Sequence, residues 1–228
     1  MTSTHTLLYA LLGGVLPALI WLAFWLREDY KNPEPRRLIL RTFLLGMGAV
    51  ILVLPFQKMV DDWLPGMTLG AIILWAILEE LFKFLAAYAG GLRTRDDNEP
   101  IDAIIYMVTA ALGFVALENT LFIFGPLAGK DVVQSFITGN LRFIGASLLH
   151  VVSSGLIGAS LAFSFYKSQL RRFTKTTQAL LVAIIFHTCF NIVIIYFGKT
   201  GTLISFTGVW VGVVYLLWTF ERAKRIAR

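Results

Sequence analysis

The sequence has few charged residues and a single cysteine. Asp, Glu, Lys and Arg make up 15% of its 228 residues, whereas a soluble domain carries about 25%. Because Cys189 stands alone, no disulfide can form within the chain. The HExxH pattern of many zinc proteases is also absent. These absences argue against an ordinary soluble domain, a disulfide-stapled fold and the usual zinc-binding helix.

Hydrophobic residues, in contrast, are abundant. They form 57% of the chain, and the mean hydropathy is +0.73. The net charge of +6 does not indicate nucleic acid, because no segment alternates basic and aromatic residues along a soluble face. We therefore expect an integral membrane protein whose surroundings are lipid.

Seven apolar segments are long enough to cross a bilayer, which takes about 20 helical residues. They lie near residues 6–26, 38–56, 67–91, 101–125, 136–166, 176–198 and 201–220. The sequence thus predicts an all-α, polytopic transmembrane helix bundle of about seven spans. No sizeable soluble domain interrupts it, so residues 1–228 are expected to form a single integral membrane domain.

The positive charges are distributed unevenly between the loops. With seven spans, 15 Lys and Arg residues fall on one side, around residues 27–41, 93–95, 167–175 and 222–228, and only three fall on the other. Positive residues near span ends favour the cytoplasm. This distribution predicts an N-terminus outside and a C-terminus in the cytoplasm.

Four segments carry polar or ionisable residues at membrane depth, where a charge costs about 2.5–3.5 kcal/mol on insertion scales and usually faces the bundle interior. These segments place the expected catalytic core at about residues 67–198. The residues are Glu79, Glu80, Lys83, Glu118, Asn119, Arg142, His150, His187 and Asn191.

Helical spacing brings some of these residues onto one face. Glu79 and Lys83 are four residues apart, as are His187 and Asn191, whereas Glu80 points about 100° away from Glu79. We expect Lys83 to influence the charge of Glu79. With the predicted topology, the polar groups share one layer from the midplane outward, which predicts a polar cavity reachable from the outer face.

Two chemistries suit this set, and both hydrolyse an amide. In the first, imidazole and carboxylate groups bind a divalent metal such as zinc and leave a position for water. The ligands are then Glu79, Glu118, His150 and His187, with Glu80 as a base. In the second, no metal is needed. Glu79 activates water as a general base, and His187 with Asn191 binds the oxyanion.

Four motifs in this order resemble the PrsW-type intramembrane proteases, relatives of the CPBP/Abi superfamily that includes the CAAX prenyl proteases. The resemblance covers roughly residues 75–195. The motifs are EExxK (Glu79, Glu80, Lys83), FxxxEN (Phe114, Glu118, Asn119), Arg142 with His150 eight residues on, and HxxxN (His187, Asn191).

The resemblance implies an endopeptidase that cleaves a membrane protein near the outer side of the bilayer. It suggests a single-span substrate, such as an anti-sigma factor, and a bacterial plasma membrane. It also favours Glu79 as the base, with Glu80 supporting it. Where the prenyl protease branch has His, this chain has Glu118, which is therefore open to three roles: metal ligand, second acid or structural partner.

Other roles remain open for these residues. Arg142 can serve as a structural counter-ion for Glu118 or Glu80, and Asn119 can hydrogen-bond a neighbouring helix. Buried Glu and His also serve as proton relays, so a proton-coupled transporter is the main rival function. A non-catalytic membrane scaffold is a third interpretation, although it needs fewer buried charges.

Overall fold

The computed structural model describes residues 3–30 and 32–226, and every regular element in these ranges is helical. Lys31 and Arg228, two of the 15 positive charges counted above, lie outside the described residues. The elements in chain order are α1 (Ser3–Leu26), the 3-10 turn η1 (Arg27–Asp29), α2 (Arg36–Trp63), α3 (Leu69–Ala87), the π-helix η2 (Tyr88–Leu92), α4 (Pro100–Ala128), α5 (Val132–Leu141), the π-helix η3 (Arg142–Ala146), α6 (Ser147–Phe163) and α7 (Gln169–Ala223).

Several helices are apolar enough to cross a membrane, as predicted. In the described part of the chain, length and composition identify five such stretches: Thr4–Asp29, Arg36–Trp63, Pro100–Ala128, Val132–Phe163 and Gln169–Ala223. The expected third span, α3, is shorter at 19 residues and carries three charged side chains. The two last expected spans fall within one element, α7. The count of seven spans and the orientation of the termini therefore stay predictions.

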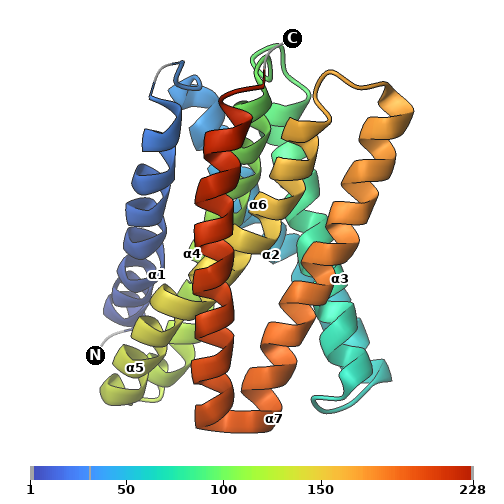
Figure 1. Ribbon diagram of the computed structural model, residues 1–228. Coiled ribbons are helices and arrows are strands. Elements are labelled where there is room, and N and C mark those ends of the chain that lie inside the picture. Colours follow the sequence, from blue (N-terminus) through green and yellow to red (C-terminus); the bar gives the residue numbers. More distant parts are fainter. Residues whose placement is uncertain (1–2, 31, 227–228) are drawn as a thin grey trace.

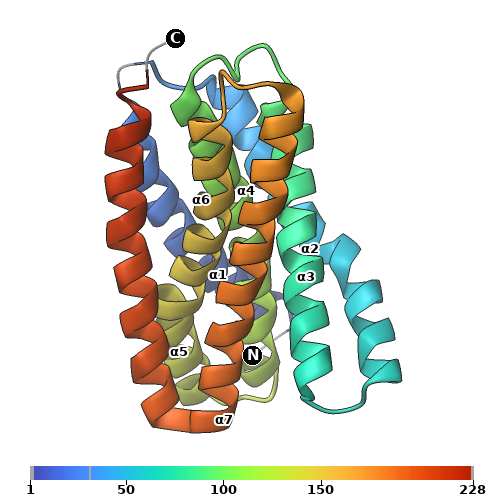
Figure 2. The ribbon, with the colours of Figure 1, turned by 45° about the vertical axis from the view of Figure 1, so that its right-hand side comes forward.

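The long helix α7 turns back on itself. Its backbone leaves the helical region at Gly198, where φ is 55° and ψ is −128°. A glycine takes a positive φ at little cost because it has no Cβ. Figures 1 and 2 show that α7 runs to one end of the bundle and returns as a second arm.

Helix α4 forms the centre of the bundle. It is buried along most of its length, and α1, α2 and α6 all pack against it. Small residues let the backbones approach closely, as is common between membrane helices. A Cβ added to Gly46 of α2 would lie 2.2 Å from the Ala110 carbonyl oxygen, and one added to Gly113 of α4 would lie 2.0 Å from the Phe43 carbonyl oxygen. This contact fixes α2 relative to α4.

Local signals set where two of the site-bearing helices begin. Thr68 caps α3, since its hydroxyl accepts a hydrogen bond from the Ala71 amide at 3.2 Å. At the start of α4, Pro100 occupies the first turn, and the Asp102 carboxylate accepts from the Glu99 amide at 2.7 Å. These caps fix the depths at which Glu79 and Glu118 stand in the bundle.

Candidate active site

A cavity of about 950 Å³ opens between α2, α3, α4, α5, η3, α6 and α7. Its walls are mostly apolar. The sequence-predicted site residues that line it are Glu79, Glu118, Arg142, His150, His187 and Asn191. The tertiary structure thus brings together residues from all four predicted motifs.

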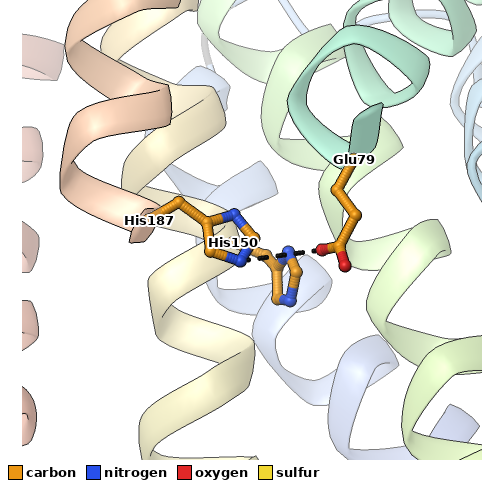
Figure 3. A group of neighbouring side chains, drawn as sticks. All are labelled: Glu79, His150 and His187. Carbon is orange, nitrogen blue, oxygen red and sulfur yellow. Dashed lines mark ion pairs between the residues drawn. The ribbon is translucent and has the colours of Figure 1, made fainter. Parts of the chain in front are cut away.

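Three of these residues converge in the cavity. Glu79 of α3, His150 of α6 and His187 of α7 point toward one another in Figure 3, and each offers one ligand atom within 4.8 Å of the other two. All three are at least 93% buried. One carboxylate and two imidazoles form the donor set of several catalytic zinc sites. The residues present therefore fit a divalent metal.

The orientation of His187 suits such a ligand. Its Nδ1 lies 2.7 Å from Glu80 Oε1, and its Nε2 lies 3.6 Å from Glu79 Oε2. With Nδ1–H donating to Glu80, Nε2 keeps its lone pair for the cavity. A carboxylate behind a histidine is the usual way in which a metal-binding imidazole is held in one tautomer.

Glu80 lies behind the cavity wall. Its side chain is fully buried and does not line the cavity. Oε1 accepts hydrogen bonds from Lys83 Nζ at 2.6 Å and from Ser153 Oγ at 2.9 Å, besides its contact with His187. Glu80 therefore supports the site and does not face a substrate.

The direct partners of Lys83 are Glu80 and His150, so its expected influence on the charge of Glu79 acts through space and not through a contact. Lys83 hydrogen-bonds Glu80, three residues before it, and its Nζ also lies 2.9 Å from His150 Nδ1. Glu79 lies four residues before Lys83 on the same helix, but its side chain lines the cavity. The Lys83 side chain is fully buried in the core. Because a lysine ammonium only donates, Nδ1 of His150 accepts the bond from Lys83. The proton of the neutral ring then sits on Nε2, which points to Glu118.

Glu118 has two partners. Arg142 Nη2 donates a hydrogen bond to Glu118 Oε2, and His150 Nε2 lies 3.2 Å from the same oxygen. Arg142 Nε also donates to Asn119 Oδ1 at 2.5 Å. Of the two counter-ion roles left open for Arg142, the structure shows the one with Glu118. Arg142 begins the π-helix η3, a type of element often found at functional sites.

Asn119 and Asn191 differ in their surroundings. Asn119 donates to Ser147 Oγ at 3.1 Å and is buried away from the cavity, so it joins α4 to α6. Asn191 is half-buried and lines the cavity one turn beyond His187. Its amide can therefore donate to a bound substrate.

The charges of the cluster do not balance. Three carboxylates, Glu79, Glu80 and Glu118, lie with two cations, Lys83 and Arg142. If both histidines are neutral, one negative charge remains in a low-dielectric environment, where an unpaired charge is costly. Either a proton on one carboxylate or a bound cation relieves this imbalance, so the site is suited to accept a cation.

The sequence motifs missed Gln57 of α2. Its Nε2 donates a hydrogen bond to Glu79 Oε1 at 3.0 Å, and its side chain lines the cavity. The only signal in the sequence was a lone amide that follows the purely apolar stretch 43–56.

The amino-acid sequence of this chain is similar to those of known membrane proteases. The family model described as "PrsW family intramembrane metalloprotease" matches residues 34–219. Protease PrsW of Oceanobacillus iheyensis is 25% identical over 96% of both chains. Protease PrsW of Halalkalibacterium halodurans is 22% identical over 91% of both chains, and that of Bacillus subtilis is 26% identical over 80% of this chain and 81% of the relative.

These relatives are proteases, which favours proteolysis over the transporter and the scaffold considered above. The wider relationship to the CPBP/Abi superfamily stays a prediction. No solved structure matches this chain significantly. The match covers most of the described residues, including every residue of the four motifs. This chain is therefore an integral membrane enzyme that belongs to the PrsW family of intramembrane proteases.

Proposed function

We propose that this enzyme is a metal-dependent endopeptidase in which Glu79, His150 and His187 hold a divalent cation, with Zn²⁺ as the best candidate. The observation that carries the proposal is the convergence of their ligand atoms within 4.8 Å, inside an apolar cavity. Such a set leaves a coordination position open for water, as catalytic sites require. A metal held there supplies Lewis acidity, which polarises a carbonyl and activates water for attack.

In this proposal, side chains of the protein position the ligands, transfer the proton and bind the oxyanion. Glu80 holds His187 through Nδ1. Lys83 contacts Nδ1 of His150, and a metal on Nε2 of that ring requires the proton on Nδ1, with Lys83 as a neutral amine that accepts it. Glu118, which lines the same cavity beside His150, accepts the proton of the attacking water and returns it to the leaving amine. Arg142 holds Glu118 in place, and the Asn191 amide donates to the oxyanion that develops on the cleaved carbonyl.

The proposal includes seven spans, with α3 as the third and the two arms of α7 as the sixth and seventh. In Figure 1 the loops after α1, η2 and α6 and the C-terminus lie at one end of the bundle, and the N-terminus lies at the other. The loops at the first end are rich in Lys and Arg. This supports a cytoplasmic C-terminus and an N-terminus outside.

The substrate class follows from the cavity and the family. The walls are largely apolar and lie between helices, which suits a single-span membrane protein cut near the outer side of the bilayer. A regulatory substrate such as an anti-sigma factor is part of the proposal. The relatives come from bacteria, which supports a bacterial plasma membrane. The proposed catalytic core comprises residues 67–198 together with Gln57, which lies outside that range and hydrogen-bonds Glu79.

The decisive experiment is a metal analysis of the detergent-purified protein beside a cleavage assay with and without a chelator. We expect about one zinc per chain, lost together with activity. His187→Ala and Glu79→Gln should lose both metal and cleavage. Full activity in metal-free protein would contradict the metal role and favour Glu79 as a general base that acts with His187 and Asn191.

A further inference from the structure

Gln57 contacts the site from a helix that the four motifs leave out. The preceding residues 43–56 of α2 contain only apolar residues and glycine. Gln57 is half-buried, and a polar side chain that is withdrawn from water needs a hydrogen-bond partner. Its Nε2 donates to Glu79 Oε1 at 3.0 Å, so that partner is the candidate ligand.

The two oxygens of Glu79 have different surroundings. Oε1 accepts the hydrogen bond from Gln57. Oε2 is buried without a hydrogen-bond partner and lies 3.6 Å from His187 Nε2. A bond to one oxygen fixes the rotation of the carboxylate, and that rotation directs the other oxygen toward the histidines.

We infer that Gln57 is a positioning residue, which orients Glu79 so that Oε2 faces His150 and His187. The inference rests on the proposed role of Glu79. Carboxylates that bind metals are themselves usually hydrogen-bonded, and loss of such a partner typically costs about 10- to 100-fold in metal affinity or activity. Gln57 also makes the geometry of the site depend on α2.

The test uses Gln57→Met and Gln57→Leu, which keep much of the side-chain volume and remove the amide. Gln178→Met is the matched control, because Gln178 is an exposed glutamine on α7 that bonds only Lys175. The full chain in detergent is titrated with Zn²⁺ against a chromophoric chelator. It is then assayed on a probe that carries one polyleucine span between two soluble tags.

We expect the Zn²⁺ dissociation constant of both Gln57 variants to rise about 10-fold or more. At saturating Zn²⁺, kcat should fall while KM changes by less than about twofold, because a positioning residue acts through Glu79 and not on the substrate. Melting temperatures should match the control. The inference is overturned if kcat and zinc affinity equal those of Gln178→Met, or if KM rises at unchanged kcat, which would make Gln57 a substrate contact.

Failure of the proposed function gives a different pattern. If wild-type protein binds no Zn²⁺ but Glu79→Gln abolishes cleavage, the metal role fails, and the kcat of Gln57→Met still decides the inference. If Glu79→Gln cleaves the probe as well as wild type, both the role of Glu79 and the inference built on it are overturned.

Discussion

His187 and Glu80 form a buried pair in which Nδ1 of the ring lies 2.7 Å from Oε1 of the carboxylate. The pair fixes which ring nitrogen faces the cavity. The two adjacent glutamates on α3 therefore differ in the groups that they contact. Glu80 holds other residues, whereas Glu79 faces the cavity.

Replacement of the two glutamates should separate these tasks. Glu80→Ala leaves the buried Lys83 ammonium without its carboxylate, and breaking a buried pair costs about 3–5 kcal/mol. Glu79→Ala removes one hydrogen bond, to Gln57, worth about 1 kcal/mol. Thermal melting in detergent should rank Glu80→Ala well below Glu79→Ala, while both lose cleavage. Equal melting temperatures would contradict the assignment.

Arg142→Lys should be poorly tolerated. Lysine keeps the charge but cannot hold Glu118 and Asn119 at once with the planar fork of arginine. Loss of a hydrogen bond to a charged group costs about 1.5–3 kcal/mol, which corresponds to a loss of roughly 10- to 100-fold in kcat/KM. Arg172→Lys is the control, since Arg172 pairs with Asp97 outside the cavity. Similar activity of both variants would refute the prediction.

The packing of α2 on α4 can be tested with two glycines of one helix. At Gly46 an added Cβ would lie 2.2 Å from the Ala110 carbonyl oxygen, whereas at Gly48 nothing lies within 4 Å. Gly46→Ala should destabilise the protein by about 1–3 kcal/mol. Gly48→Ala should stabilise it by about 0.5–1 kcal/mol, because alanine loses less backbone freedom. The measurement is the free energy of unfolding of both variants from denaturation curves. If Gly46→Ala proved more stable than Gly48→Ala, α2 and α4 would not pack this way.

A second cluster of acidic side chains, formed by Asp29, Glu34 and Asp102, should make stability depend on pH. Burial, reinforced by the Asp102 charge and opposed by a hydrogen bond from Tyr106, raises the pKa of Glu34 from 4.5 to about 8. The folded state then binds the proton more tightly than the unfolded state. Stability from this group is complete below about pH 4.5 and is lost as pH rises to about 8.

Glu34→Gln should flatten this dependence, because the amide stays neutral and can still accept from Tyr106. Its melting temperature at pH 8 should exceed that of wild type by about 2–4 °C for each kcal/mol gained. Asp62→Asn, at an exposed pair with Lys58, serves as the control. A Gln variant that keeps the wild-type pH slope would show that Glu34 is not the responsible group.

From the amino-acid sequence alone the chain could be predicted to be helical and apolar, and certain residues stood out as too costly at membrane depth to be accidental. Those costs depend on composition and helical period, which are local properties. The four motifs also named every residue of the Glu79, His150 and His187 cluster. The tertiary structure confirmed their convergence within one cavity.

Which of these residues faces the cavity, and which residues pair with one another, depends on the packing of the helices. Glu79 and Glu80 are adjacent and point about 100° apart, so the position of the cavity relative to α3 determines which of them meets a substrate. The same packing explains why Lys83 hydrogen-bonds Glu80 and why Gln57 hydrogen-bonds Glu79. Such pairings depend on how whole helices rotate and approach one another, and that is set by contacts such as Gly46 against Ala110, which no single helical pattern contains.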